Sequence, residues 1–178
     1  LTIGWGGHVQ AVALALPAMT LRDAHVVQAV GSRGGSILQL VHPRLVESIA
    51  LRLEATPHFL PAPTFASSAA ERDAIARDPY FGKVLERLAQ TDVALFGIGP
   101  TSPQHSGLCR VGALDGWELE RVRSQGAVGE ILAEFFDIQW HSSDPLLAGQ
   151  LLLPFLGSDY GVALKNGDVA GVIIDGTS

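Results

Sequence analysis

Cysteine and basic residues are scarce in this sequence. Cys109 is the single cysteine, so no disulfide can form within the chain. A lone cysteine is typical of proteins in a reducing compartment, and we therefore expect a cytoplasmic protein. Lysines and arginines number 12 against 18 aspartates and glutamates, which gives a net charge of −6. A nucleic-acid surface carries an excess of positive charge, so this segment lacks the composition to bind DNA by itself.

Long apolar runs and the usual catalytic and metal-binding patterns are also missing. No apolar run approaches the roughly 18 residues that a membrane span needs, so we expect no membrane partner. The six histidines show no short ligand spacing, and one cysteine cannot build a thiolate site, so neither a metal nor a cofactor is expected. The Gly-x-Ser-x-Gly motif of many hydrolases is absent, and we assign no catalytic residue.

Apolar residues, by contrast, are plentiful. They make up 47% of the chain, whereas charged residues make up 17%, below the roughly 25% typical of globular proteins. This balance predicts a large core or a buried subunit interface. The length of 178 residues fits one domain, which we place at residues 1–178.

Short apolar segments of strand type alternate with segments of helical periodicity. This alternation predicts an α/β fold, in which a mostly parallel sheet carries helices on both faces. Pro43 is expected in the first turn of its helix, and residues 100–116 are expected to form a loop. Strands are predicted at 1–3, 25–30, 58–60, 92–96 and 169–174, helices at 8–16, 43–54, 68–77, after 79 and at 117–124, and either type at 131–136.

Glycine-rich turns follow three of the expected strands, at Gly4–Gly7, Gly31–Gly35 and Gly97–Gly99. In parallel α/β folds, ligands bind beyond the carboxyl ends of the strands. Glycines let backbone amides approach an anion, and a following helix directs its positive end toward it. Each turn alone is equally compatible with a tight connection without a ligand. The coincidence of three such turns predicts a ligand site.

Several side chains near these turns are candidates for ligand contact. Arg33 could make a forked contact to a phosphate, and Glu130 could accept hydrogen bonds from sugar hydroxyls. His8 could donate to a ligand oxygen, and Trp5 could stack on a sugar ring. Ordinary roles in packing or on the surface remain open for each of them. The predicted ligand-binding set is Gly4, Trp5, Gly6, Gly7, His8, Arg33, Gly34, Gly35, Gly97, Gly99 and Glu130.

Five motifs occur in an order found in one family of regulators. They are Gly4-Trp5-Gly6, Leu60-Pro61-Ala62-Pro63, the run 89–99 that ends in Gly97-Ile98-Gly99, the run 126–137 that contains Gly129-Glu130, and the late segments 163–167 and 172–175. Through them, nearly the whole chain resembles the sugar-binding domain of SorC/DeoR-type bacterial transcription regulators.

The resemblance implies a Rossmann-like fold related to that of sugar-phosphate isomerases and CoA transferases. It also implies a phosphorylated sugar or related carbohydrate as effector, bound among Gly4–His8, Arg33–Gly35 and Glu130. A homodimer or homotetramer is expected, with operator DNA bound only through an N-terminal helix-turn-helix part that this sequence lacks.

The sequence departs from the family pattern at two points, and two other functions remain open. His8 stands where the family usually has a hydroxyl residue, and Lys165 matches an arginine of the family rather than its late phosphate-binding lysine. An isomerase-like enzyme is one alternative, because Glu130 could be one member of the acid–base pair that such a reaction needs. An oligomerisation module without a ligand is the other.

Overall fold

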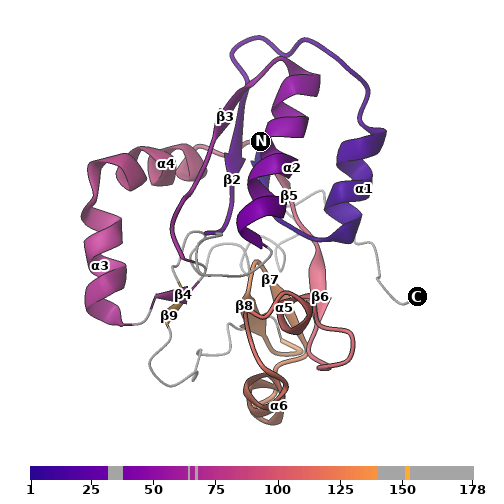
Figure 1. Ribbon diagram of the computed structural model, residues 1–178, viewed down its shortest axis with the longest axis vertical. Coiled ribbons are helices and arrows are strands. Elements are labelled where there is room, and N and C mark those ends of the chain that lie inside the picture. Colours follow the sequence, from indigo (N-terminus) through magenta and orange to yellow (C-terminus); the bar gives the residue numbers. More distant parts are fainter. Residues whose placement is uncertain (32–37, 64, 67, 140–150, 153–178) are drawn as a thin grey trace.

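A four-stranded parallel sheet forms the centre of the molecule (Figure 1). The computed structural model describes residues 1–31, 38–63, 65–66, 68–139 and 151–152. The strand order is β3-β2-β1-β5, and each neighbouring pair is parallel. The strands are β1 (Thr2–Ile3), β2 (His25–Gln28), β3 (Thr56–His58) and β5 (Ala94–Leu95).

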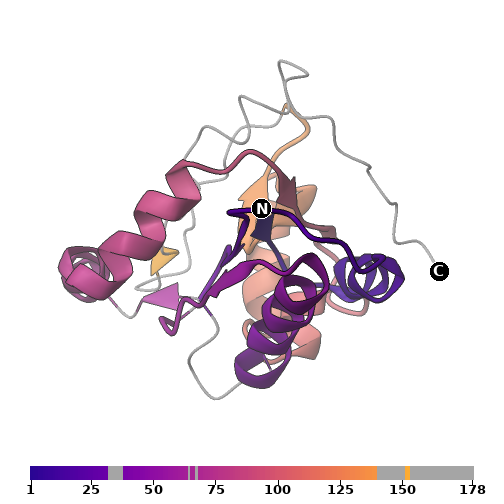
Figure 2. The same ribbon diagram turned by 90° about the horizontal axis from the view of Figure 1, so that it is seen from above.

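Helices cover both faces of this sheet (Figure 2). Val26 packs with α1 (Gly7–Ala15) and α2 (Leu38–Leu53), whereas Val27 packs with α4 (Pro79–Ala89) on the opposite face. Successive residues of a strand point to opposite faces, so both valines are buried, with at most 2% of their surface exposed. The predicted α/β, Rossmann-like class is therefore confirmed.

A second sheet, antiparallel and three-stranded, lies below the first in Figure 1 with two helices beside it. Its core is built around the fully buried Leu108, Leu119 and Phe135. The ambiguous segment 131–136 is resolved as the inner part of a β-hairpin, with one strand on each side of its turn. The elements are β6 (Ile98–Pro100), α5 (Gly107–Arg110), α6 (Gly116–Ser124), β7 (Gly129–Ile131) and β8 (Glu134–Phe136).

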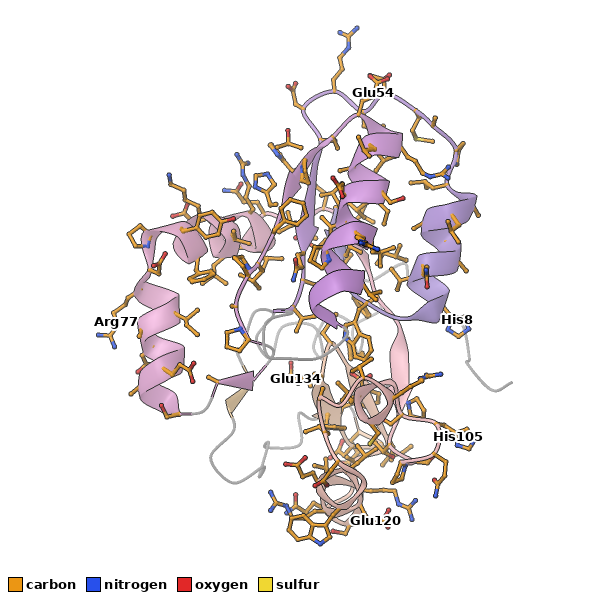
Figure 3. All side chains as sticks on the ribbon, in the orientation of Figure 1. His8, Glu54, Arg77, His105, Glu120 and Glu134 are labelled. Carbon is orange, nitrogen blue, oxygen red and sulfur yellow. The ribbon has the colours of Figure 1, made fainter. Side chains whose placement is uncertain are left out.

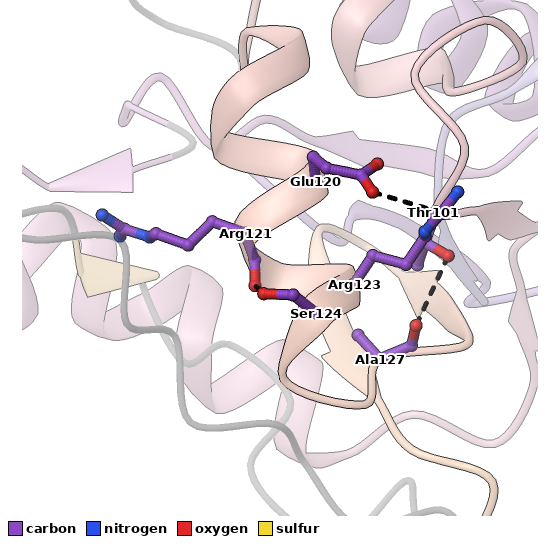
Figure 4. Close-up of polar contacts among 6 residues, drawn as sticks. All are labelled: Thr101, Glu120, Arg121, Arg123, Ser124 and Ala127. Carbon is purple, nitrogen blue, oxygen red and sulfur yellow. Dashed lines mark hydrogen bonds and ion pairs between the residues drawn. The ribbon is translucent and has the colours of Figure 1, made fainter.

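Side-chain hydrogen bonds define both ends of α6. Asp115 and Glu118 form a reciprocal capping box at the start of α6, with N–O distances of 2.7 and 2.8 Å. At the other end of α6, the Ser124 hydroxyl donates to the Arg121 carbonyl at 2.7 Å (Figure 4). The start of α6 is therefore set by local sequence alone.

Two predictions about local structure were wrong. Pro43 lies inside α2, which begins at Leu38 rather than at the proline. Pro43 is the sixth residue of α2 and lacks the N–H that would donate to the Gln39 carbonyl, so the helix continues through the proline with the loss of that one hydrogen bond. The expected loop at 100–116 contains α5, a single turn capped by Ser106, which is too short to show a helical period.

The remaining described elements lie at one side of the parallel sheet. Ser68 accepts a hydrogen bond from the Glu71 amide at 3.1 Å, so the predicted helix start is confirmed. None of the described helices is long and apolar enough to cross a bilayer. The predicted strand at 169–174 and the late motifs at 163–175 lie outside the described residues. The elements are β4 (Phe65–Ala66), α3 (Ala69–Arg77) and β9 (Leu151–Leu152), which pairs with β4.

Candidate functional site

The connections of the parallel sheet diverge on the two sides of β1. The chain passes from β1 through α1 to β2 on one side, and β5 pairs with β1 on the other side. In open α/β sheets, ligands bind in the crevice at such a point, beyond the carboxyl ends of the strands. The residues that follow β1 and β5 are Gly4 and Phe96-Gly97. Gly4 and Gly97 therefore both lie at the carboxyl end of the sheet. The turn predicted at Gly97–Gly99 was wrong beyond Gly97, because Ile98 and Gly99 belong to β6 and pair with β7.

Gly4 has almost no free space around its Cα. A Cβ atom at this position would lie 2.8 Å from Cβ of Phe96 and 2.7 Å from Cδ2 of Leu132. The Gly4 amide donates to the Leu95 carbonyl at 2.7 Å, which continues the pairing of β1 with β5. Glycine at this position lets β5 and the β7–β8 hairpin close onto the end of β1.

No described residue fills the space at the start of α1. Among residues 1–31, 38–63, 65–66, 68–139 and 151–152, no heavy atom would lie within 4 Å of a Cβ atom on Gly6 or Gly7, and Gly6 has a φ of 130° that other residues rarely adopt. No side chain caps the helix, and its first turn contains no acidic residue. The first amides of a helix lack partners within the helix and carry partial positive charge. This end of α1 can therefore accept oxygen atoms of a ligand.

His8 and Trp5 flank this turn in different ways. His8 is exposed and lies at the start of α1 on the outer surface (Figure 3). Trp5 is half-buried and packs against the core of the antiparallel part. A Cβ atom on Gly107 would lie 3.1 Å from Cη2 of Trp5. The packing role left open for Trp5 is thus present, while its contact with a ligand stays a prediction.

Glu130 is buried beside the third glycine turn. It pairs in register with Gly99, and a Cβ atom on Gly99 would collide with the Glu130 carboxyl. Oε2 of Glu130 accepts a hydrogen bond from the Ala133 amide at 2.8 Å. Burial raises the pKa of the Glu130 carboxyl to about 7, and the hydrogen bond from Ala133 lowers it only in part. The site thus holds a carboxyl group that changes charge near neutral pH.

The hairpin turn that Glu130 supports is strained. Leu132 and Ala133 both have positive φ values, of 55° and 71°, which cost residues with a Cβ on the order of 1 kcal/mol each. Leu132 faces Gly4, so this turn brings the antiparallel part to the crevice. Neither residue was singled out from the sequence, because two-residue hairpin turns usually signal themselves by Asn-Gly or Asp-Gly.

His42 is a second buried polar group that the sequence reasoning missed. Its side chain is fully buried on α2, and its Nε2 lies 3.2 Å from the carbonyl oxygen of Ile3, the last residue of β1. Burial lowers the pKa of His42 to about 4, against the opposing effect of the Ile3 and Gly4 carbonyls. A helical period places position 42 on the same face as Val46 and Ile49, and this signal could have found it.

The second glycine turn is described only at its first residue. A Cβ atom on Gly31 would collide with the carbonyl oxygens of Ala62 and Pro63, so the segment after β3 packs directly on this glycine. The Gln28 amide group donates to the Val30 carbonyl at 2.8 Å and accepts from the Leu60 amide at 3.3 Å. Arg33, Gly34 and Gly35 lie outside the described residues, and their ligand contacts stay predictions.

The region beyond the carboxyl ends of β1 and β5 therefore combines the helix start at Gly6–His8 with the buried carboxyl of Glu130. Within the described part of the chain, no group of three or more histidine, cysteine, aspartate or glutamate side chains could hold a metal ion. Amides and a carboxyl that can be protonated suit a small ligand with several hydroxyl groups or an anionic group.

A parallel α/β sheet whose connections diverge on the two sides of β1 defines this chain as an open α/β domain, a class in which ligands commonly bind at such a point. The chain belongs to the family described as "Putative sugar-binding domain", whose model matches residues 1–144. This match confirms the resemblance identified from the motifs.

One named relative and several solved structures are transcription regulators or domains of such regulators. The erythritol catabolism regulatory protein EryD of Brucella abortus is 22% identical over 171 residues, which cover 96% of this chain and 51% of that protein. A DeoR family transcriptional regulator from Listeria monocytogenes has a TM-score of 0.71 at 19% identity, covering 85% of this chain and 59% of that one.

The full-length sorbitol operon regulator SorC from Klebsiella pneumoniae also has a TM-score of 0.71, at 21% identity over 85% of this chain and 49% of that one. The structural likeness establishes a shared fold. The chain spans about half the length of these relatives.

Proposed function

We propose that this chain is the effector-binding domain of a bacterial transcription regulator, and that its effector is a sugar, a polyol or a phosphate ester of one. The observation that carries the proposal is the divergence of the connections at β1, where the Gly4–Gly7 turn follows the strand and the hairpin that holds the buried Glu130 contacts Gly4 through Leu132. The names of two relatives, regulators of erythritol catabolism and of a sorbitol operon, support a polyhydroxylated ligand.

Different residues of the described part can contact different groups of such a ligand. The open amides at Gly6–His8 face oxygen atoms of a phosphate or a hydroxyl group. Glu130, whose pKa lies near 7, can accept from a hydroxyl when ionised and donate to one when protonated. The predicted guanidinium of Arg33 and the amides of Gly34 and Gly35 would add a second contact to an anionic group.

In the longer protein, the domain would act on DNA through a neighbouring segment. A single domain at 1–178 with a net charge of −6 leaves operator binding to another part of the protein. An effector that binds one conformation of a homodimer or homotetramer more tightly shifts the population toward that conformation. The domain would thus act in the cytoplasm without catalysis.

A thermal-shift screen tests the proposal. The probes are erythritol, sorbitol, ribose 5-phosphate and fructose 6-phosphate, each at millimolar concentration. A ligand of the folded state raises the melting temperature with increasing concentration. Stabilisation by a phosphate ester but not by its free sugar identifies a phosphorylated effector. No stabilisation by any probe contradicts the proposal and favours an oligomerisation module without a ligand.

A pair of substitutions then tests whether the probe binds at the start of α1. Gly7→Asp adds a negative charge at the open start of α1, where an added side chain meets nothing. Ala70→Asp adds the same charge to the first turn of α3, a helix of equal length outside the crevice. We expect Gly7→Asp to weaken binding of a phosphate ester about tenfold or more, whereas Ala70→Asp leaves the dissociation constant unchanged.

An isomerase-like activity is the second candidate, because Glu130 has a pKa suited to general acid–base chemistry. Following ribose 5-phosphate and fructose 6-phosphate by NMR with the purified protein tests it. Turnover that Glu130→Gln abolishes would support this candidate, and intact substrate would support binding alone.

A further inference from the structure

His42 occupies a position where the surrounding core calls for an apolar side chain. Its neighbours on the same face of α2, among them Val46 and Ile49, are apolar and form one cluster with Ile3 of β1. An imidazole in such a cluster is desolvated, which is unfavourable unless its nitrogens find partners. The histidine therefore makes a specific bond rather than filling space.

The Ile3 carbonyl determines which nitrogen of the His42 ring carries the hydrogen. Nε2 lies 3.2 Å from the Ile3 carbonyl oxygen. A carbonyl can only accept, so Nε2 carries the hydrogen and Nδ1 is an acceptor. Nδ1 is buried and has no hydrogen-bond partner among the residues that the structure describes.

This contact joins α2 to the end of β1, where the Ala29 amide donates to the same Ile3 carbonyl at 2.9 Å and continues the pairing of β1 with β2. Ile3 is the last residue of β1, and Gly4 begins the first glycine turn directly after it. His42 lies one helical turn after Leu38, where α2 begins. The bond thus fixes the end of β1 against the first part of α2.

We infer that His42 is a positioning residue for ligand binding, whose Nε2–H group holds the Ile3 carbonyl and so sets the first glycine turn. The inference rests on the proposed function of the crevice. Because none of its surface is exposed, the imidazole acts through Gly4–His8 and does not itself touch the ligand.

Two substitutions separate the hydrogen bond from the packing. Glutamine in His42→Gln keeps a donor and an acceptor, whereas leucine in His42→Leu fills a similar volume with neither. Calorimetry uses whichever of the four probes stabilises the wild-type protein most. We expect His42→Gln to bind within about twofold of wild type. We expect His42→Leu to bind about threefold more weakly or worse, because the Ile3 carbonyl keeps the Ala29 amide as a donor but loses the imidazole. Equal affinities for His42→Leu and wild type would overturn the inference.

Hydrogen exchange without ligand supplies an independent readout. His42→Leu should speed amide exchange in the segment 4–9 more than elsewhere, and His42→Gln should restore protection. Val46→Ala, one turn further along α2, is the matched control, because it weakens the same cluster without touching the Ile3 carbonyl. The same exchange pattern in His42→Leu and Val46→Ala would reduce His42 to a packing residue and overturn the inference.

These experiments separate the two proposals. If no probe binds the wild-type protein, the proposed function fails, while the exchange measurement still decides the role of His42. If His42→Leu does not fold, long-range nitrogen NMR of the wild-type imidazole decides. A hydrogen on Nε2 supports the inference, and a hydrogen on Nδ1 with a bare Nε2 contradicts it.

Discussion

The two sides of the crevice each contain one buried titratable side chain, and the two are kept neutral from opposite directions. On the parallel-sheet side, burial lowers the pKa of His42 to about 4, so the imidazole stays uncharged. On the antiparallel side, burial raises the pKa of Glu130 to about 7, so the carboxyl holds a proton more readily. Each side chain makes a hydrogen bond to the backbone next to a turn, His42 to Ile3 and Glu130 to Ala133. Both side chains do so mainly in their uncharged forms.

This comparison predicts opposing effects of pH on stability. Glu130 has a raised pKa in the folded state, so its contribution is present below pH 4.5 and is lost as the pH rises through about 7. His42 has a lowered pKa, so its contribution is present above pH 6.5 and is lost as the pH falls through about 4. Between pH 4.5 and 6.5 the stability loss from Glu130 and the stability gain from His42 cancel as the pH rises.

Substituting either Glu130 or His42 should reveal the pH dependence of stability that the other group causes. We expect Glu130→Gln to lose stability as the pH falls from 6.5 to 4.5, and His42→Gln to lose stability as it rises over that range. Each change relative to wild type should be on the order of 2–3 kcal/mol, measured by urea unfolding. Glu120→Gln, at an exposed carboxyl, is the control. Profiles parallel to wild type in both variants would refute the comparison.

Adding a side chain at Gly4, where the two sides of the molecule touch, should have the next largest effect on stability. In Gly4→Ala the new Cβ atom would overlap Phe96 and Leu132, and such overpacking typically costs about 2 kcal/mol. In Gly7→Ala the new atom meets nothing and joins a helix, so stability should stay equal or rise by about 0.5 kcal/mol. Denaturant midpoints measure both. Equal midpoints would mean that the hairpin does not press on Gly4.

Relieving the strained hairpin should offset the loss of a buried methyl group on the antiparallel side. Ala133 has a φ of 71° and is fully buried. In Ala133→Gly the relief of about 1 kcal/mol of strain opposes a similar loss of burial, so the free energy of unfolding should change by less than about 0.5 kcal/mol. Ala127→Gly is the control, because Ala127 is buried in the same part without a positive φ and should lose stability. Destabilisation by Ala133→Gly as large as that by Ala127→Gly would argue against strain at the turn.

The smallest effect is expected at the surface of the antiparallel part. Arg123 and Glu120 form an ion pair at 3.2 Å with both side chains about half exposed (Figure 4). Exposed pairs contribute about 0.5 kcal/mol or less, so Arg123→Gln should hardly move the urea midpoint at low salt. A loss above about 1 kcal/mol would show that the pair supports the fold.

The parallel-sheet side was predictable from the sequence, and much of the other side was not. Strand-type runs, helical periods and glycine turns are local signals, and they placed Gly4–Gly7 and Gly97 after strands of the parallel sheet. They did not reveal that Ile98 and Gly99 belong to a strand of the second sheet. The burial of Glu130 depends on space that Gly99 leaves on a strand distant in sequence. The hairpin at Leu132 and Ala133 carries no turn residues, so only tertiary packing reveals it.

The central claim is that the crevice between β1 and β5 binds the effector, and an amide NMR titration tests it most directly. Ribose 5-phosphate or the most stabilising of the other probes is added to labelled wild-type protein. We predict concentration-dependent shifts confined to Gly4–His8, Gly97–Gly99 and Glu130–Ala133, with α3 and α6 unaffected. Saturable shifts that avoid these segments, or no shifts with any probe, would contradict the account.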